Sequence, residues 1–546
     1  MMYNPEIEKE IQTLTQAIEG NDGFRSGTPP RWMAIQLLEG ECKDPIPVEV
    51  QKALAESQAR LVDRFGVELD LIFADNRYQF VRSLVDETLT RRDLEKPTRS
   101  DQLDRLLTNQ YLGAPIFLII MYFIFNIVQN VSAPYLDWID YLFTGPITHW
   151  TTATLTWLNA PDWLLSLAVD GVLAGLGGVL VFFPGLFTMY FCLAVLEESG
   201  YLARAAFVMD RFMSKVGLHG KSFIPMILGF GCNVPAIYAT RTIERREARL
   251  LTGLLIPFMS CSARLPVYLI FGLAFFPDHA NLVITGMYIT GIMVAAVVGI
   301  ILSRTLFKGR TLSILVMELP AYRIPTLKCV IDYAWDQTKQ FVRKAGMLIV
   351  MFSMGLWLLL NLPWGVADHH QSYYGRLSSG LSPVLEPAGF GTMEASGALV
   401  TGLVAKEIVV STLAQLYHAP QEEAAEENLS LWEEVQAILW GFGEATLQSG
   451  KELMEVFTPG ISLFSDEEGN GENVALSRAL QKAFTPLSAI SFLLFVLLYV
   501  PCVATIGAQR QEFGWKWAAV SVAITLVVPW VMSVLVYQTG SLLGLG

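Results

Sequence analysis

The sequence has few charged residues for its length. Asp, Glu, Lys and Arg make up 16% of its 546 residues, whereas 53% are hydrophobic. A soluble protein of this size needs more charge to cover its surface, so the composition excludes an ordinary soluble globular protein. The net charge of −13 lies in blocks, and no basic stripe indicates a nucleic-acid partner.

Several motifs with known chemistry are also missing. The six cysteines form no CxxC pair and no disulfide framework. Gly220-Lys221-Ser222 matches the end of a phosphate-binding loop, but Lys215 stands where that loop needs its first glycine. No Asn precedes a Lys, and neither GxSxG nor HExxH occurs. We therefore expect no GTP binding by this chain and no catalytic residue, and we expect Ser222 to begin a helix as its N-cap.

The first part of the chain, residues 1–110, is polar and lacks a cleavable signal peptide. Its segments "IEKEIQTLTQAI" and "VQKALAESQARLVDRF" have the apolar spacing of helices. "TPPRWMAIQLLEGE" begins with proline and is typical of a helix start. These patterns predict a small helical domain.

Long apolar runs begin after residue 110 and predict an all-α, multi-pass membrane protein. The first run, "GAPIFLIIMYFIFNIV" near residues 113–131, opens a segment 111–165 that we expect to hold one transmembrane helix and an outer loop. No Lys or Arg lies between Arg105 and Arg204, so the positive-inside rule places residues 132–165 outside and the N-terminal domain in the cytoplasm. The next run returns through about 166–196, with expected interruptions at "GLGG" and Pro184.

The run from Ser222 to Tyr238 is too short to cross and return. It lies between Lys221 and the basic segment "RTIERREAR", so both of its ends should face the cytoplasm. A crossing takes about 20 residues. The sequence therefore predicts a re-entrant segment that enters as half a helix, breaks at "GFGCNVP" and returns. Irregular backbone at membrane depth occurs only where protein or a water-filled cavity covers it, and transporters bind substrates at such breaks.

The second half repeats the order of features in the first half. Gly389 aligns with Gly217, and "TGLVAKE" aligns with "GFGCNVP". "YVPCVAT" around Cys502 corresponds to "PFMSCSAR" around Cys261. Three crossings and one re-entrant segment per repeat require the second repeat to be inverted, with seven crossings in total and the C-terminus outside. The predicted segments are a first repeat at 166–303, a cytoplasmic connector at 304–344, and a second repeat at 345–546 with an acidic, outer loop at 417–482.

Three cysteines lie at predicted helix breaks inside the membrane: Cys232, Cys261 and Cys502. Thiolates suit borderline divalent transition metals, and the breaks free backbone carbonyls. Cysteine is also a common small packing residue, which is our interpretation of Cys192, and spacing leaves both readings open for the other three. Three interpretations of Lys406 and Glu407 remain open. They form an internal ion pair, or they lie at the membrane interface with their charged ends reaching water, or they belong to a functional site. The candidate metal ligands are Cys232, Cys261, Cys502, Asn233, Ser260, Ser262 and Glu407.

Several long blocks resemble the FeoB family of bacterial ferrous iron transporters. The most specific is "LEESGYLARAAFVMDR…GKSFIPMILGFGCNVPAIYATRTIERREARLLTGLLIPFMSCSARLPVY", and "MELPAYRIPTLKCV", "KAGMLIV" and "GLVAKEIVVSTL" support it. The likeness covers nearly the whole chain. It implies Fe²⁺ uptake across a bacterial inner membrane through two Gate repeats, a cytoplasmic helical domain at the N-terminus, and a role in the Gate for Cys232, Cys261 and Cys502.

One departure from the family is large. Its members normally begin with a GTP-binding domain, which this sequence lacks, so we expect that domain as a partner in cis or in trans. FeoA- or FeoC-like cytoplasmic proteins, membrane lipid and further copies of the chain are the other expected partners, with Fe²⁺ as the transported substrate and no permanent cofactor. The alternative function is a secondary transporter of a neutral solute such as a nucleoside. The cysteines favour iron, because a nucleoside site needs aromatic and amide groups at the breaks.

Overall fold

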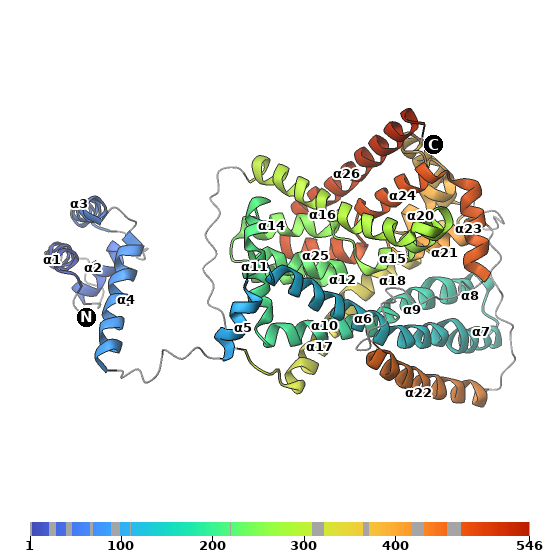
Figure 1. The fold of residues 1–546 in the computed structure, drawn as a ribbon, viewed down its shortest axis with the longest axis horizontal. Helices are drawn as coiled ribbons and strands as arrows, with labels where there is room; N and C mark the ends of the chain where they lie inside the picture. Colours follow the sequence, from blue (N-terminus) through green and yellow to red (C-terminus); the bar gives the residue numbers. More distant parts are fainter. Residues whose placement is uncertain are drawn as a thin grey trace. The chain divides into compact units, whose positions relative to one another are not determined.

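The structure is a computed structural model in which all regular elements of the described residues are helical (Figure 1). The chain divides into two compact units, Met1–Thr98 and Arg99–Gly546. The structure describes residues 3–20, 29–39, 46–65, 69–88, 99–109, 111–218, 220–307, 322–363, 371–417, 431–455 and 471–544.

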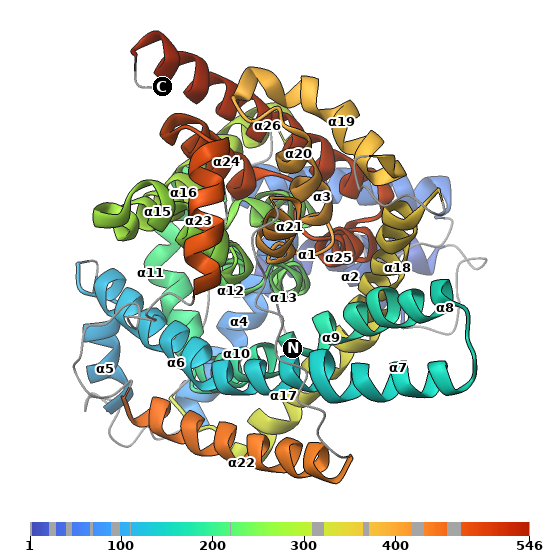
Figure 2. The same cartoon turned by 90° about the vertical axis from the view of Figure 1, so that its right-hand side faces the viewer.

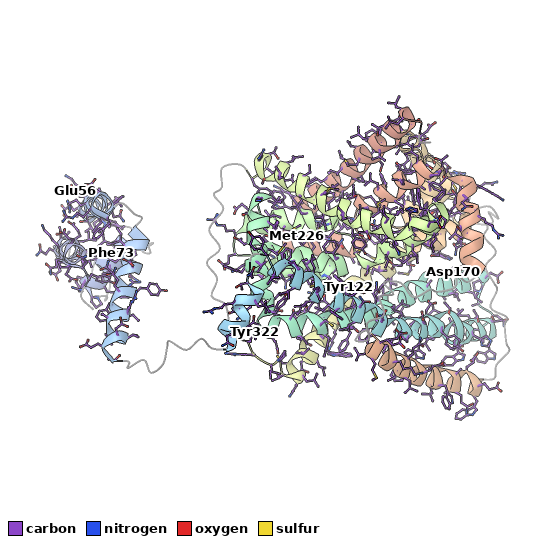
Figure 3. All side chains as sticks on the ribbon, viewed as in Figure 1. Glu56, Phe73, Tyr122, Asp170, Met226 and Tyr322 are labelled. Carbon is purple, nitrogen blue, oxygen red and sulfur yellow. The ribbon has the colours of Figure 1, made fainter. Side chains whose placement is uncertain are left out.

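The first unit contains four helices around one apolar core. In α1, Ile7, Ile11, Leu14 and Ile18 follow helical spacing and are almost completely buried. Phe73, labelled in Figure 3, lies edge-on against Tyr3 with 5.5 Å between the ring centroids. The helical pattern predicted for this part of the chain is therefore present. The helices are α1 Pro5–Glu19, α2 Pro30–Leu38, α3 Val48–Phe65 and α4 Leu69–Thr88.

Ion pairs cover the outside of this core. Arg60 donates hydrogen bonds to both carboxylate oxygens of Glu10, at 3.1 and 2.9 Å. The Arg60 guanidinium holds the pKa of the Glu10 carboxyl below its usual range. Because Arg60 belongs to α3 and Glu10 to α1, the pair adds a polar connection between two helices that the apolar core already holds together.

The second unit starts with α5 (Arg99–Leu107) and a helix longer than the sequence indicated. α6 (Gly113–Leu142) continues through a π-helical segment at Phe143–Ile147 into α7 (Thr148–Trp157). The prediction of an outer loop over 132–165 is therefore wrong for most of that range. The 45 helical residues span about 68 Å, more than twice the thickness of a bilayer core. The π-segment lets the helix continue across Pro146, whose ring cannot fit a regular helical ladder.

A second long helical stretch returns beside the first. It runs from Asp162 to Glu198, and the predicted interruption at "GLGG" is wrong because these residues lie in the regular helix α9. Its π-helical segment at Leu167–Leu173 contains Asp170, which accepts a hydrogen bond from Ser166 at 2.7 Å and is exposed near the far end of this hairpin (Figure 3). The helical parts are α8 Asp162–Ser166, α9 Ala174–Leu180 and α10 Phe182–Glu198.

The first repeat contains the predicted re-entrant segment. α11 (Tyr201–Lys215) ends before Gly217, whose φ of +83° favours glycine. α12 then starts at Phe223, immediately after Ser222, as predicted. The Ser222 hydroxyl makes no capping hydrogen bond to the helix, however, and is buried. The remaining helices are α12 Phe223–Gly231, α13 Asn233–Ala239, α14 Arg246–Leu255, α15 Leu265–Phe275 and α16 Ala280–Thr305.

The second repeat has the same order of elements. α19 (Tyr373–Leu385) is followed by Gly389, whose φ of +87° matches that of Gly217. α20 and α12 are both nine-residue half-helices that end at a break. The alignment of Gly389 with Gly217 therefore joins equivalent backbone positions. The other helices are α17 Leu327–Phe341, α18 Met347–Asn361, α20 Met393–Thr401, α21 Ile408–Leu416, α23 Gly471–Ala483, α24 Pro486–Leu498, α25 Val503–Phe513 and α26 Trp515–Leu542.

Seven helices of the described residues are long and apolar enough to cross a membrane, which agrees with the predicted number. The fifth extends back through α17, so part of the predicted connector 304–344 is continuous with a crossing. The spans are Gly113–Trp157, Asp162–Glu198, Arg246–Phe275, Pro277–Thr305, Leu327–Asn361, Pro486–Phe513 and Trp515–Leu542.

One helix of the acidic loop packs along the first hairpin. α22 (Leu431–Glu455) runs antiparallel to α6 and α7, as Figures 1 and 2 show. Ser449 donates to the carbonyl of Val131 at 2.8 Å, and Glu434 at the other end lies 2.7 Å from the His149 ring. Within the loop 417–482, α22 therefore lies along the first hairpin.

Candidate functional site

The first helix break lies at Cys232. α12 ends at Gly231 and α13 begins at Asn233, so Cys232 alone has extended backbone, with φ −149° and ψ 130°. The Ser262 hydroxyl donates a hydrogen bond to the Gly231 carbonyl at 3.0 Å. Asn233 is buried, and its side-chain oxygen has no hydrogen-bond partner. The break therefore presents a thiol beside an unused oxygen ligand.

The second break interrupts the third span, Arg246–Phe275, around Cys261. A 3-10 turn ends at Phe258, and the chain becomes helical again only at Ser262. The Ser260 and Tyr268 hydroxyls are hydrogen-bonded at 3.0 Å. Ser260 is thus tied into the core, whereas Ser262 joins this break to the one at Cys232.

The second repeat has two matching breaks. The first, residues 402–407, separates α20 from α21, and the second, residues 499–502, separates α24 from α25. The Val503 N–H donates to the Leu403 carbonyl at 2.9 Å, which joins the two breaks as Ser262 does in the first repeat. A Cβ at Gly402 would lie 2.2 Å from the Tyr499 hydroxyl, so only glycine permits this approach.

The four breaks meet at the middle of the membrane unit, and we call residues 231–233, 259–262, 402–407 and 499–503 the break junction. Viewed as in Figure 2, α12, α13, α21 and α25 project onto the centre of the bundle, and α13 packs against both α12 and α25. Cys232 lies within electrostatic range of Cys261, Cys502 and Glu407, and Cys502 within range of Cys261. The Cys502 thiol also lies 3.2 Å from the Thr505 hydroxyl. The structure thus brings the predicted candidates from both repeats to one place.

The junction is not a closed metal cage. Among the described residues, no three His, Cys, Asp or Glu side chains lie close enough together to hold a metal ion. The carbonyl ends of α12, α20 and α24, and of the 3-10 turn that follows α14, all lead into it. Helix C-termini carry partial negative charge, but α13, α21 and α25 begin at the same breaks with partial positive charge, so it is the freed carbonyl oxygens rather than the helix dipoles that can bind a cation here. Two to three thiols with oxygens remain the predicted ligand set.

Among the described residues, two buried cations lie in or directly beside the junction, Lys406 and Arg264. Arg264 is 0% exposed and donates to the carbonyls of Met259 at 2.9 Å and Pro257 at 3.1 Å. Lys406 is 2% exposed, so it does not snorkel, and the ion pairs found among the described residues do not join it to Glu407. An arginine within an apolar span was the available signal for Arg264.

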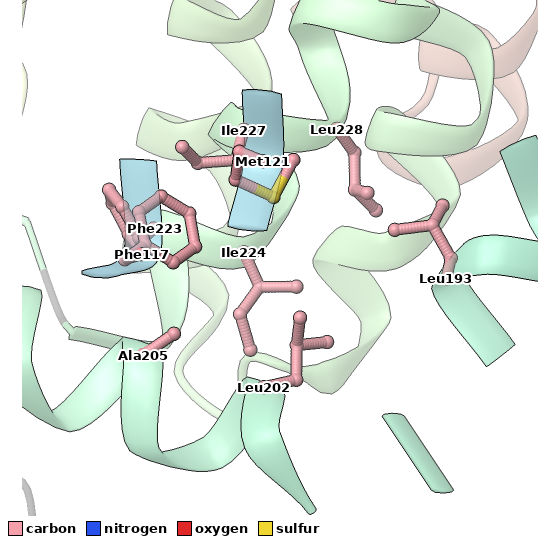
Figure 4. A pocket seen from close by; sticks show the side chains of 9 residues that line it. All are labelled: Phe117, Met121, Leu193, Leu202, Ala205, Phe223, Ile224, Ile227 and Leu228. Carbon is pink, nitrogen blue, oxygen red and sulfur yellow. The ribbon is translucent and has the colours of Figure 1, made fainter. Parts of the chain in front are cut away.

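Two other features lie outside the break junction: the Gly220–Ser222 segment and an apolar pocket. The Gly220–Ser222 segment forms a short 3-10 turn whose Lys221 pairs with Glu244 at 2.7 Å. A pocket between α6, α11 and α12 is lined only by apolar side chains and has no group that could bind an ion (Figure 4). Its lining consists of Phe117, Met121, Leu193, Leu202, Ala205, Phe223, Ile224, Ile227 and Leu228.

Three family models match the chain in consecutive parts. The FeoB cytosolic helical domain matches residues 3–90. The Gate model, described as nucleoside recognition, matches residues 179–275 and 342–516, which include the whole break junction. The model of the ferrous iron transport protein B C terminus matches residues 284–337. No solved structure matches the chain.

Named relatives match almost the entire chain. The Fe(2+) transporter FeoB of Staphylococcus aureus (strain COL) is 35% identical over 99% of this chain and 74% of its own length. The Fe(2+) transporter FeoB of Methanocaldococcus jannaschii is 32% identical with the same coverage. A Fe(2+) transport protein A/Fe(2+) transporter FeoB fusion protein of Porphyromonas gingivalis is 35% identical over 99% of this chain, which spans 64% of that relative. With these matches and a Gate unit built from two broken-helix repeats, the chain belongs to the FeoB family.

Proposed function

We propose that this chain carries Fe²⁺ across the membrane through the break junction. The observation that carries the proposal is that three thiols from both repeats lie within electrostatic range of one another at interrupted helices inside the membrane unit, although among the described residues they are not close enough together to hold one ion. Fe²⁺ is a borderline metal that accepts both thiolate and oxygen ligands. The thiols of Cys232, Cys261 and Cys502 would supply the soft ligands, and the unpartnered Asn233 oxygen a hard one.

An open ligand set suits transport better than a closed one. An ion held by four thiolates would leave slowly, whereas conduction needs binding that is weak enough to release the ion. Glu407 and the carbonyls freed at the breaks would complete the shell as the ion passes. A thiol must lose its proton to bind a metal, so Fe²⁺ uptake should rise with pH between about 6 and 8. Ser260 contributes less than Ser262, because its hydroxyl is fully buried against the Tyr268 hydroxyl, whereas the Ser262 hydroxyl donates to the Gly231 carbonyl and keeps its oxygen lone pairs available.

The relatives support the substrate and suggest partners. They are named Fe(2+) transporters, and none of the reported names includes a nucleoside, although the Gate model's description does. We propose uptake across a bacterial inner membrane, with a GTP-binding domain acting in cis or in trans. The fusion protein of Porphyromonas gingivalis joins a transport protein A to its FeoB part, which favours an FeoA-like protein as a partner of this chain.

Fe²⁺ uptake into proteoliposomes tests this function. We expect the purified chain to carry Fe²⁺ under anaerobic conditions, and to respond to an added GTP-binding domain from a relative. Labelled nucleoside, offered to the same vesicles, is the matched control for the alternative substrate. Nucleoside uptake without Fe²⁺ uptake, with or without the added domain, would contradict the proposal.

The proposed topology has the N-terminus inside, and both the hairpin tip and α22 outside. It depends on the absence of Lys and Arg between Arg105 and Arg204, and on the packing of α22 along α6 and α7. In a Cys-free background, an impermeant thiol reagent should label Thr156→Cys and Lys451→Cys in intact cells. Lys52→Cys in α3 is the cytoplasmic control and should stay unlabelled until the cells are opened. Protection of both outer positions would reverse the orientation.

A separate cysteine position tests the side of the C-terminus in the same labelling experiment. An odd number of crossings, as in the proposed topology of seven, would put it on the side opposite the N-terminus. Ser541→Cys, near the end of α26, should therefore react in intact cells. Protection of Ser541→Cys with labelling of Thr156→Cys would show that the second repeat is not inverted as proposed.

A further inference from the structure

The side chain of Lys406 occupies the break junction. It extends from the break between α20 and α21 to the break between α24 and α25. Its Nζ donates a hydrogen bond to the Val500 carbonyl at 2.7 Å and lies 2.9 Å from the centroid of the Tyr499 ring. A carbonyl oxygen and an aromatic face both attract cations. The ammonium therefore sits in a cation-binding position inside the membrane unit.

The surroundings of Lys406 are those expected for the transported ion. Its charge lies within electrostatic range of Cys261, Cys502 and Glu407, which attract it, and of the buried Arg264 guanidinium, which repels it. The backbone carbonyls freed at the ends of α20 and α24 add acceptor oxygens at the same place, where α21 and α25 begin. A buried cation without such compensation would be very costly, so these groups explain why a lysine is tolerated there.

Arg264, the other buried cation, is held differently. Its guanidinium donates to two carbonyls only five and seven residues earlier in the chain. Arg264 therefore holds the shape of the local segment from Pro257 to Arg264. Lys406 instead reaches across to a break 94 residues away, and among the described residues Val500 is the acceptor found for its three donors. Lysine is also a flexible point charge, whereas the guanidinium is a rigid fork. Of the two buried cations, Lys406 is thus the one whose charged end can move away from its acceptor.

We propose that the Lys406 ammonium is a tethered cation that occupies the Fe²⁺ position in the break junction, and that an arriving divalent cation must displace it from Val500 and Tyr499. The inference rests on the proposed function. Displacement weakens the binding of the ion, because the free energy needed to move the ammonium offsets part of the free energy of ion binding. It also favours divalent over monovalent cations, because a single charge only equals the one that it replaces.

Co²⁺ binding to the purified full chain tests the proposal, because thiolate-bound Co²⁺ has characteristic absorption bands. Lys406→Met keeps the length and packing of the side chain but removes the charge. We expect Lys406→Met to bind Co²⁺ on the order of 10- to 100-fold more tightly than the wild type, and Lys406→Arg to bind no more tightly. Lys451→Met on α22 is the matched control for loss of a lysine, and it should titrate as the wild type does.

Uptake kinetics give a second readout that a merely structural role would not change in this way. In vesicles, Lys406→Met should lower both the Fe²⁺ concentration for half-maximal uptake and the maximal rate, since a tighter ion leaves more slowly. A folded Lys406→Met protein that binds Co²⁺ as weakly as the wild type, or more weakly, would overturn the proposal.

A second pair of variants keeps the test decisive if Lys406→Met does not fold. Tyr499→Leu removes the aromatic face that holds the ammonium, whereas Tyr499→Phe keeps it. Co²⁺ should bind more tightly to the Leu variant than to the Phe variant, and equal affinities would overturn the proposal. The two levels of inference remain distinguishable. Missing thiolate bands in the wild type would contradict the cysteine site itself, whereas bands without these differences would contradict only the role of Lys406.

Discussion

Replacing Cys232, Cys261 and Cys502 together by serine is expected to reduce Fe²⁺ uptake by at least 100-fold. Serine nearly preserves the shape of cysteine but not its soft, easily ionised sulfur, so the variant should fold while its site loses the ligands suited to Fe²⁺. All three residues lie at breaks that meet in one junction. Uptake by the triple variant in vesicles, beside a thermal unfolding curve that shows the fold is intact, measures the effect.

Single substitutions should give smaller, graded losses of about 10-fold each, because two thiols remain. Cys192→Ser and Cys329→Ser are matched controls. Cys192 packs against an apolar cluster, and Cys329 lies exposed on α17, so neither should change uptake. The rise of uptake with pH should also disappear in the triple variant. A folded triple variant with the wild-type rate and pH profile would show that the cysteines are packing residues.

Arg264→Leu is expected to destabilise the membrane unit by about 4 kcal/mol and to abolish transport. The substitution leaves the carbonyls of Pro257 and Met259 without the donors of the fully buried Arg264, and each such group costs about 1–3 kcal/mol. The loop that carries Cys261 would then lose its shape. Arg264→Lys should recover part of the stability, because an ammonium can reach one carbonyl but lacks the fork for both.

Thermal unfolding in detergent measures this effect. Arg304→Leu is the matched control, since Arg304 is exposed on α16 and its loss should change stability by less than about 0.5 kcal/mol. Equal unfolding temperatures for Arg264→Leu and Arg304→Leu would contradict the role of Arg264 in holding the break open.

The helix breaks could be predicted because each depends on local chemistry. Gly229, Gly231 and Pro235 interrupt an apolar run at Cys232, and Pro501 does so beside Cys502. The run from Ser222 to Tyr238 is also too short for two full crossings, so its length alone indicates a re-entrant segment. The positive φ of Gly217 and Gly389 agrees with the alignment of the repeats, because a left-handed backbone is a local property that glycine permits.

The extent of the first hairpin could not be predicted in this way. Residues 132–157 contain Pro134, Gly145 and Pro146, which are typical of a loop. They are helical because the hairpin packs against α22, from a part of the sequence about 300 residues away. Such tertiary contacts override local propensity and leave no signal in the segment itself.

The sequence by itself determined the class of the protein, the number of crossings and the positions of the four breaks, because composition, run length and Gly/Pro placement act locally. Only the tertiary structure decided that the breaks meet. It also decided that the Lys406 ammonium lies on the Tyr499 ring rather than in an ion pair with Glu407, and that Arg264 bonds the carbonyls of the loop that carries Cys261. These outcomes depend on how two repeats far apart in the chain pack together, which local pattern does not specify.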